Sequence, residues 1–562
     1  MKAGETTLQK LLNTSRQFIV PIYQRSYSWD ELQYRRLWLD IVHAGSFDTG
    51  KTHFIGSVVY IDMGTPAGRP QQLMLIDGQQ RLTTISLLIC ALRRFILANN
   101  ISSKLFSAAK LQNQFLCNTD ETDADRLKLI LTQQDAQTYL SLLEETEYTL
   151  REPSLRLLSC WHYFNSELIK YADKLDIIFK GILNLSLVSI SLDKNTDNPQ
   201  RIFESMNSTG RDLSQADLLR NFLLMDLAAA QQKKLYKTYW QPMEQAFGQV
   251  HYLDSFDNFL RDFLTVQRGR ICRNDEIYEV FKRFFAASAQ TNEQVLQQLF
   301  ICARYYVYIA LAQEKDRQLA AVWQQLRSVD SGVSYPFFLQ LYADYTAGKF
   351  DKTTLIDAAK MTVSYLMRRA LRSLPAAPLA RMFASLHDKL DIRNIDCSMA
   401  KFYITQNGSC IFPTDYQVRE SLLSKDVYHF KLKNFLLQSL ENYQHKEPID
   451  FAAAKYSIEH IMPQHKELNT DWQKALGSNW QEVQRLYLHT LGNLTLTGYN
   501  SEMGDKSFAQ KKNSAAGFAH SHLLLNKYLA QCAKWDKNAI LKRTHLLTDI
   551  VLQIWPYPQF KK

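Results

Sequence analysis

The sequence predicts an α+β protein that is mostly helical and consists of three consecutive regions. Runs rich in β-branched and aromatic residues lie in the first and last thirds of the chain, where strands are expected. Residues 226–400 instead carry apolar side chains at helical spacing and few turn signals. The length of 562 residues exceeds what one hydrophobic core usually supports. We therefore expect domains at residues 1–225, 226–400 and 401–562.

The first region mixes strands with helices. Its β-type runs cover residues 17–22, 53–61, 72–76 and 185–192. A dense apolar run at residues 82–97 predicts a buried helix soon after the third of these strands. The middle region, in contrast, is expected to be a helical spacer or clamp.

The last region returns to a mixed pattern, with strands expected at residues 456–461 and 491–497 and a helix from about Ser501. Residues 501–562 contain ten Lys or Arg and four Asp or Glu, so this tail holds +6 of the chain's net charge of +10. A basic surface is therefore expected here, and phosphate backbones are its natural partner.

Cysteine usage and hydropathy predict where the protein works. The eight cysteines are scattered and form no Cys-x-x-Cys pair, which indicates reduced side chains rather than a zinc knuckle. The N-terminal segment lacks the apolar stretch of a signal peptide, and Arg93 and Arg94 interrupt the most apolar run. We expect a cytoplasmic protein that makes no membrane contact.

Three polar elements of the last region suggest a catalytic site. Glu459 and His460 stand side by side at the end of a strand that Pro463 terminates. Asn493 follows a glycine at the start of the next strand, and Asn500 or Ser501 is expected to cap the N-terminus of the following helix. A strand, a strand and a helix that carry these residues form the layout of a ββα-metal nuclease.

The chemistry of phosphodiester hydrolysis accounts for each residue type. The reaction needs a base for water, a divalent cation, and positive groups that hold the backbone. His460 is the predicted base because its ordinary pKa is near neutral, and Asn493 is predicted to hold the loop and the imidazole in position. Glu459 and Asn500 offer the hard oxygen ligands that Mg²⁺ prefers. Three lysines of the helix expected after Asn500 are predicted to contact the DNA backbone: Lys506, Lys511 and Lys512.

A simpler interpretation competes with the catalytic one. A Glu-His pair after an apolar run is more often a satisfied surface pair than a catalytic pair. Three matching elements in the right order favour the nuclease interpretation. His465 and His489 lie nearby, but nothing in their context distinguishes them, so we expect both to be structural or solvent-facing.

The motifs of the last region resemble those of one known family. Glu-His-Ile-Met-Pro-Gln, then Leu-Gly-Asn-Leu-Thr-Leu, then Asn-Ser with Phe508 and Lys511 resemble the C-terminal HNH-type nuclease domain of the GmrSD modification-dependent (type IV) restriction endonucleases. The resemblance covers roughly residues 440–513. Asn500 stands where the HNH pattern has its last His, so the chain carries a His-Asn-Asn variant.

A second candidate site lies in the first region, in the segment Asp-Gly-Gln-Gln-Arg between a strand and a helix. Gly78 permits a tight turn, and the N–H groups of the helix start attract an anion. Arg81 can grip a phosphate with two hydrogen bonds, and Asp77 can bind a metal or position water. Such a junction is often only a turn, so binding needs support from other motifs.

The order of the motifs in the first region supplies that support. Residues 21–29, 77–81, 203–210 and 217–221 follow the order of the N-terminal domain of the GmrSD family, which resembles the ParB and sulfiredoxin fold. The resemblance implies binding and hydrolysis of a nucleoside triphosphate. The predicted nucleotide site comprises Asp77, Gly78, Gln79, Gln80, Arg81 and, in a loop beside the pocket, Asn207.

The aromatic segment at residues 21–29 is predicted to sense the DNA. In relatives that recognise modified DNA, the corresponding Tyr-Gln-Arg element reads the modification or couples it to the nucleotide. The resemblance extends that role to Tyr23, Gln24 and Arg25. Tyr27 and Trp29 have the alternative role of packing against the first helix.

Together the motifs predict a single-chain endonuclease that is regulated by a nucleotide, depends on Mg²⁺ and cuts or nicks modified double-stranded phage DNA. One alternative is a nucleotide-hydrolysing regulatory or DNA-binding protein with a vestigial nuclease site, and another is an RNA-directed nuclease. The modification, the preferred nucleotide, the sign of the control and assembly into a homo-oligomer are left open by the sequence.

Overall fold

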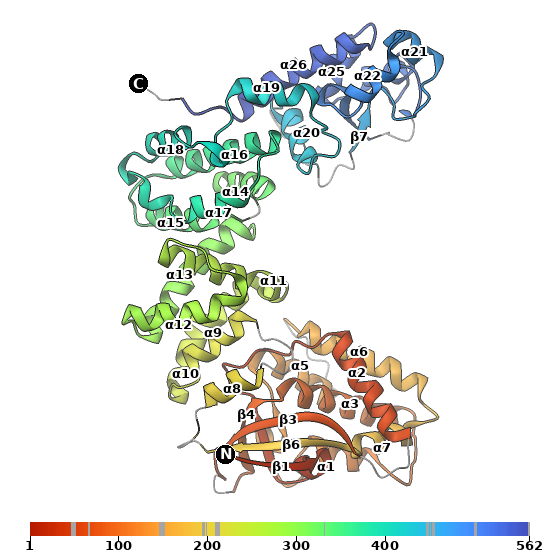
Figure 1. Ribbon diagram of the computed structural model, residues 1–562. Coiled ribbons are helices and arrows are strands. Elements are labelled where there is room, and N and C mark those ends of the chain that lie inside the picture. Colours follow the sequence, from red (N-terminus) through yellow and green to blue (C-terminus); the bar gives the residue numbers. More distant parts are fainter. Residues whose placement is uncertain are drawn as a thin grey trace. The chain divides into compact units, whose positions relative to one another are not determined.

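The computed structural model describes residues 1–46, 52–65, 68–144, 152–193, 199–207, 214–330, 332–445, 456–498 and 503–559, together with 197, 449 and 451 (Figure 1). These residues form two compact units. Unit 1 comprises Met1–Gln245 and Tyr278–Gln297, and unit 2 comprises Ala246–Ile277 and Gln298–Lys562. Residues 226–400 are shared between the two units, and the three predicted domain ranges stay predictions.

Unit 1 contains a mixed six-stranded sheet of order β1-β6-β3-β4-β2-β5. Its strands are β1 Lys2–Thr7, β2 Arg16–Ile19, β3 His53–Asp62, β4 Gln71–Asp77, β5 Leu129–Ile130 and β6 Leu185–Leu192. The four predicted strands are confirmed as β2, β3, β4 and β6. The pattern does not reveal β1, a polar and mostly exposed edge strand, or the two-residue β5 on the opposite edge.

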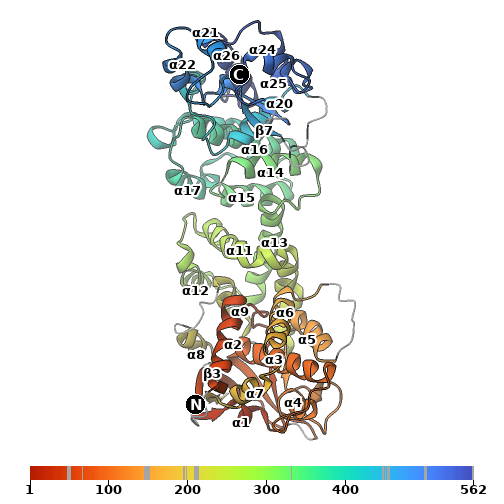
Figure 2. The same ribbon diagram turned by 90° about the vertical axis from the view of Figure 1, so that its right-hand side faces the viewer.

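Helices of unit 1 cover the sheet, and α3 is the most deeply buried of them. They are α1 Leu8–Leu12, α2 Glu31–Ser46, α3 Gln79–Ala98, α4 Ala108–Leu111, α5 Gln133–Glu144, α6 Leu155–Lys170, α7 Leu175–Leu183, α8 Pro199–Asn207, α9 Gln215–Leu224 and α10 Ala229–Leu235. Helix α3 packs on α6, while α2 packs on α6 and α7 (Figure 2). The helix predicted at residues 82–97 is thus confirmed, and it begins directly after β4.

Unit 2 is largely helical. Two helices have residues in both units, α11 Gln241–Arg268 and α13 Asn292–Ala310, and α12 Ile277–Ser288, between them, lies in unit 1 apart from Ile277. The next are α14 Arg317–Val329, α15 Tyr335–Thr346, α16 Lys352–Leu371, α17 Ala377–Ala384, α18 Ile395–Ile404, α19 Asp415–Ser424 and α20 Lys433–Asn442. Arg368 of α16 is fully buried and donates hydrogen bonds to the carbonyls of Trp555 and Pro413, which ties the C-terminal segment to this helix.

The last part of unit 2 places two short strands among helices. Strands β7 Ser457–His460 and β8 Leu494–Thr497 are antiparallel, and His460 lies opposite Leu494. The helices are α21 Thr470–Leu476, α22 Trp480–Tyr487, α24 Phe508–Asn513, α25 Leu524–Gln531 and α26 Lys537–Ile554. Both predicted strands are confirmed in position. Asn500 and Ser501 lie outside the described residues.

Helix α26 fixes the Leu-Gly-Asn segment from which β8 starts. The buried Arg543 donates to the carbonyls of Gly492 at 2.8 Å and Leu494 at 2.6 Å. A Cβ atom on Gly492 would lie 2.2 Å from the carbonyl oxygen of Ile540, so only glycine lets the helix backbone pass this close.

Each helix in the described part of the chain is too short or too polar to span a membrane.

Candidate active site

Glu459 and His460 lie at the end of β7, as the sequence predicts. Pairing with β8 fixes this strand, and the N–H of Ile461 extends the pairing by donating to the carbonyl of Asn493 at 2.9 Å. Both side chains are almost fully enclosed, with 5% of Glu459 and 4% of His460 exposed. The strand end therefore presents an acid and an imidazole in a protected setting, where polar groups interact more strongly than in water.

Asn493 holds the loop that follows His460. Its amide oxygen accepts hydrogen bonds from the Met462 N–H at 2.8 Å and the Trp535 indole at 3.2 Å. Its amide nitrogen donates to the carbonyls of Met462 and Leu488. These four bonds use the full capacity of the amide. Asn493 thus holds the loop, as predicted, and its amide has no hydrogen bond left for the imidazole, so its predicted effect on the imidazole can act only through that loop.

The imidazole of His460 is held between Gln464 and His489. Its Nδ1 lies 2.7 Å from the Gln464 amide and its Nε2 lies 3.0 Å from Nδ1 of His489. Burial, together with the neighbouring His489 and Lys511, lowers the pKa of His460 to about 3. The ring is therefore neutral at neutral pH, which is the state a proton acceptor requires.

His489 is a site residue that the sequence interpretation did not single out. It is half-buried and lies one hydrogen bond from His460, and the Tyr428 ring lies against both imidazoles. No local pattern reveals this contact because residues 428, 460 and 489 come from distant parts of the chain. The one signal available was the position of His489 directly before the Leu-Gly-Asn motif.

Lys511 binds Glu459 and does not face solvent. Its ammonium group lies 2.5 Å from a Glu459 carboxylate oxygen and 2.8 Å from the His460 carbonyl, and the side chain is fully buried. Burial raises the pKa of Glu459 and lowers that of Lys511, while the ion pair opposes both shifts. The predicted contact of Lys511 with the DNA backbone is wrong, because Lys511 shares the inward face of α24 with Phe508, three residues earlier.

The other two lysines are differently placed. Lys506 is exposed, whereas Lys512 is half-buried and donates to the carbonyl of Cys532 at 2.9 Å. Lys506 is thus available to a backbone phosphate without any rearrangement. For Lys512, DNA contact stays a prediction that requires its present hydrogen bond to break.

The donors predicted for Mg²⁺ fit that ion in part. Glu459 supplies a carboxylate, the kind of ligand that Mg²⁺ prefers, but Lys511 engages its Oε1 atom. A cation would therefore bind through the other oxygen or share the carboxylate with the ammonium group. Asn500 lies outside the described residues, so the metal site stays a prediction.

In unit 1, Gly78 forms the predicted turn between β4 and α3. It has a φ of 92°, in the left-handed region that favours glycine, and no side chain caps the helix that it precedes. A Cβ atom here would lie 3.0 Å from the carbonyl oxygen of Ser57. The start of the 20-residue α3 is therefore a tight glycine turn, in which Asp77 is the last residue of β4.

Arg81 packs against a second glycine, Gly56, which the sequence motifs did not single out. Its Nη1 atom donates to the Ser57 carbonyl at 2.7 Å, and its Nη2 atom would lie 2.9 Å from a Cβ atom on Gly56. Burial lowers the pKa of the guanidinium, and the carboxylate of Asp77 opposes this. Gly56 thus makes room for the arginine that was predicted to bind phosphate.

Gln79 and Gln80 hold the aromatic segment of the first region. Gln79 donates to the Arg25 carbonyl at 3.1 Å, and Gln80 both donates to the Ser26 carbonyl and accepts from the Ser28 N–H. Both glutamines are buried. The structure therefore joins two of the predicted motifs, and these side chains reach the loop at residues 25–28. Direct nucleotide contacts of the two glutamines stay a prediction.

The predicted sensing residues lie mostly inside unit 1. Tyr23 is fully buried with its hydroxyl near the Met74 sulfur, and the buried Gln24 donates to the Ile76 carbonyl at 2.9 Å. Packing against β4 leaves neither side chain free to contact a DNA base. Of the two predicted roles, reading the modification or coupling it to the nucleotide, only coupling suits these positions, and it stays a prediction. Arg25, in contrast, keeps part of its side chain exposed and forms an ion pair with Asp217 at 3.7 Å.

The remaining motif lies around α8 and α9. Asn207 is the last residue of α8, and its side chain lies outside the described part of the chain. Asp217 braces α9 by binding Arg220, whose guanidinium also donates to the Tyr23 carbonyl at 2.8 Å. This motif is thus connected to the aromatic segment through buried ion pairs.

The chain matches two known domain families in the order in which the candidate sites occur. Residues 8–224 match the GmrSD restriction endonuclease N-terminal domain, and residues 412–550 match the GmrSD restriction endonuclease C-terminal domain. The two matched segments contain the Asp77–Arg81 turn and the Glu459–His460 strand end. No curated protein matches the chain.

These features define the chain as a restriction endonuclease with an N-terminal and a C-terminal functional domain. The chain belongs to the GmrSD family of type IV restriction endonucleases.

Proposed function

We propose that this restriction endonuclease uses His460 to cut or nick modified phage DNA in the cytoplasm, in a reaction that depends on Mg²⁺ and is regulated by a nucleoside triphosphate. The observation that carries the nuclease part is the buried pair at the end of β7. There a neutral imidazole and a carboxylate are adjacent and each is held by further side chains. The HNH type of the nuclease is part of the proposal.

His460 accepts the proton of the attacking water in this proposal. Gln464 and His489 fix the plane of its ring, and Asn493 fixes the loop that follows it. A base that is already oriented loses less freedom in the transition state, which favours the reaction. Because both ring nitrogens are engaged, one hydrogen bond of the imidazole must break when DNA binds so that the attacking water can take its place.

Glu459 and Asn500 would hold the divalent ion, which supplies charge stabilisation at the phosphate and the leaving oxygen. Lys511 has a separate task, because its ammonium group compensates the buried carboxylate of Glu459 when no cation is near. Lys506, which is exposed, contacts the DNA backbone.

Nucleotide control is proposed to act through the turn at Gly78. Arg81 and the N-terminus of α3 bind the phosphates, since both attract anions. Gln79 and Gln80 connect this turn to the loop at residues 25–28. A change at the phosphate site is thereby passed to Arg25 and its partner Asp217.

A second function is favoured by one observation. Because Lys511 engages Glu459, the structure also suits a nucleotide-hydrolysing regulatory or DNA-binding protein with a vestigial nuclease site. The two functions differ in whether DNA is cut at all.

Plasmid cleavage tests the proposed function. Modified and plain supercoiled plasmids are incubated with the full chain, a nucleoside triphosphate and either Mg²⁺ or excess EDTA. We expect nicked or linear product from modified plasmid with Mg²⁺ and none with EDTA. Nucleotide hydrolysis without any cleavage of either plasmid would support the vestigial alternative, and cleavage in EDTA would contradict the metal requirement.

A further inference from the structure

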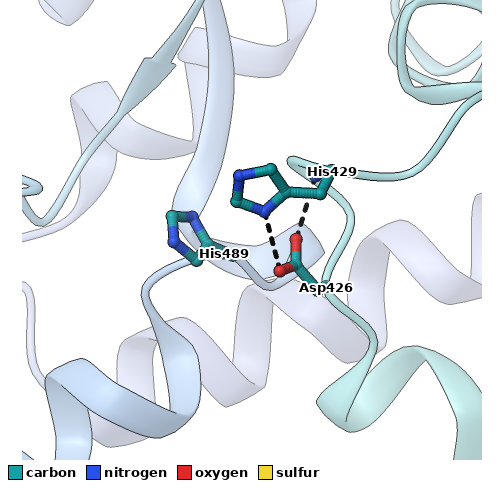
Figure 3. Close-up of side chains that lie close together, drawn as sticks. All are labelled: Asp426, His429 and His489. Carbon is teal, nitrogen blue, oxygen red and sulfur yellow. Dashed lines mark hydrogen bonds and ion pairs between the residues drawn. The ribbon is translucent and has the colours of Figure 1, made fainter.

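A cluster of metal-binding side chains lies beside the His460 pair. Asp426, His429 and His489 each offer one ligand atom, and these atoms all lie within 4.8 Å of one another (Figure 3). Asp426 and His429 follow α19, whereas His489 follows α22. None of the three belongs to the predicted Mg²⁺ site at Glu459 and Asn500.

The backbone holds the two contributing segments together. The N–H groups of Val427 and Tyr428 both point to the carbonyl of His489, at 2.8 and 3.3 Å. The Tyr428 ring stacks on the His489 imidazole with a centroid separation of 5.4 Å and an interplanar angle of 16°. The cluster is therefore a fixed feature of unit 2 and not a chance approach of long side chains.

Asp426 orients the His429 side chain. One carboxylate oxygen accepts the His429 N–H, and the other lies 2.9 Å from Nδ1 of its imidazole (Figure 3). The Asp426 and His429 side chains are 49% and 65% exposed, so an ion can enter from solvent. His489 closes the inner side of the cluster, where it is half-buried.

We propose that Asp426, His429 and His489 bind a divalent transition metal of the zinc class. Two imidazole nitrogens and one carboxylate suit Zn²⁺, Co²⁺ or Ni²⁺, whereas Mg²⁺ prefers oxygen ligands alone. With metal–ligand bonds of about 2.0–2.2 Å, the ligand atoms of a tetrahedral ion lie roughly 3.3 Å apart. The three ligand atoms, which lie within 4.8 Å of one another, would have to move closer to reach that spacing, and water would fill the position that remains.

The neighbourhood of His489 has the form expected of a metal ligand. A ligating imidazole ordinarily makes a hydrogen bond through its other nitrogen. Nδ1 of His489 faces Nε2 of His460 at 3.0 Å, which leaves Nε2 of His489 for the ion. The ion is thus one imidazole away from the proposed base, yet its binding does not depend on the proposed nuclease function.

Titration with Co²⁺ tests the site on the full chain. Co²⁺ is added to chelator-treated protein while its visible d–d absorption is recorded, and Zn²⁺ is then added in competition. We expect one Co²⁺ per chain to give these bands and Zn²⁺ to remove them. His429→Ala and Asp426→Asn should each weaken Co²⁺ binding more than about tenfold, because each removes or weakens one of three ligands.

Two matched variants separate this site from its surroundings. His465→Ala removes an exposed imidazole of the same unit, and Glu459→Gln removes the carboxylate predicted to bind Mg²⁺. Both should retain the Co²⁺ bands with unchanged affinity. Unchanged affinity in His429→Ala and Asp426→Asn would overturn the proposal, as would absence of the bands from the wild-type chain or their loss in Glu459→Gln protein that circular dichroism shows to be folded. Because binding is read without DNA, failure of the proposed nuclease function leaves this result intact.

Discussion

At the scale of single residues, the site is a set of buried polar groups that satisfy one another. The Lys511 ammonium group favours the charged form of Glu459, whose pKa burial raises, and His460 is oriented by the side chains on its two nitrogens. Enclosed polar groups without partners are costly, so each partner stabilises the fold as well as the site. Substitutions here must therefore be judged by stability and activity together.

Lys511→Met should destabilise unit 2 by about 3–5 kcal/mol, because it leaves the Glu459 carboxylate buried without a counter-charge. The measurement is the urea midpoint of the unfolding transition that reports on unit 2. Lys512→Met, which removes the neighbouring and half-buried lysine, is the matched control with a much smaller effect. Adding Glu459→Gln to Lys511→Met should recover part of the loss, and equal midpoints for the two lysine variants would contradict the account.

At the scale of secondary structure, the sequence predicts the elements near both sites but not their contacts. The runs at residues 53–61 and 185–192 combine β-branched residues with burial, and they appear as β3 and β6 with nearly the predicted bounds. The edge strand β1 was not predicted, because its residues are mostly polar and do not alternate between apolar and polar. The spacing of apolar residues in the sequence shows which face of a strand or helix is buried. An exposed edge strand such as β1 has no apolar face, so the sequence does not reveal it.

For the candidate sites, too, the sequence predicts the local elements but not the contacts between distant segments. Local motifs located Glu459, His460 and the turn at Gly78. They did not show that Lys511 turns inward, that His489 reaches His460, or that Gly56 makes room for Arg81. Each of these contacts joins segments far apart in the chain, so it is decided by tertiary packing rather than by sequence spacing.

Gly492→Ala tests how α26 positions the Leu-Gly-Asn segment. The added methyl group would lie 2.2 Å from the Ile540 carbonyl, so helix and segment must separate. We expect loss of stability of at least about 2 kcal/mol, within the range for overpacked cores, and slower DNA cleavage. Gly498→Ala is the control, because a Cβ atom there would lie 4.0 Å from a ring carbon of Tyr456, which is ordinary van der Waals contact. Comparable stability and cleavage in both variants would refute the close-packing explanation.

Asp135 of α5 should make the stability of unit 1 depend on pH. Burial raises its pKa to about 6, so the folded state keeps a proton that the unfolded state releases near its ordinary value of 3.8. A raised folded-state pKa contributes stability below about pH 4 that is lost as the pH rises through 6. Asp135→Asn should therefore stabilise unit 1 by about 3 kcal/mol at pH 8 and little at pH 4, since one pKa unit corresponds to roughly 1.4 kcal/mol.

Urea unfolding at the two pH values measures this difference. The carboxamide that Asp135→Asn introduces can still accept the Tyr27 N–H that Asp135 binds at 2.5 Å. Asp123→Asn, which changes an exposed carboxylate, should behave like the wild type at both pH values. A gain from Asp135→Asn that is as large at pH 4 as at pH 8 would show that another cause is responsible.

At the scale of the whole molecule, the proposed control requires that nucleotide binding in the N-terminal domain changes cleavage by the C-terminal domain. Arg81→Ala should weaken nucleotide binding and also alter the rate of DNA cleavage, through a shifted equilibrium between states of the protein. By linkage, modified DNA must change nucleotide affinity by the same factor as the nucleotide changes DNA affinity.

Calorimetric titration of the nucleotide, with and without modified DNA, measures this coupling. Arg16→Ala is a suitable control, because Arg16 lies on β2 and binds Gln71 outside the Gly78 turn. Nucleotide affinities that do not respond to modified DNA, together with normal cleavage by the Arg81→Ala chain, would show that the two domains act independently.

His460 is proposed to be the base of the DNA-cutting site, and cleavage by His460→Ala tests this role most directly. The initial rate at which supercoiled modified plasmid is nicked in Mg²⁺ is measured for the wild type, His460→Ala and the exposed control His465→Ala, after circular dichroism has shown that all three are folded. We expect His460→Ala to be slower by about 10²–10⁴-fold, the usual contribution of a general base, and His465→Ala to match the wild type. Nicking by folded His460→Ala at the wild-type rate would contradict the account.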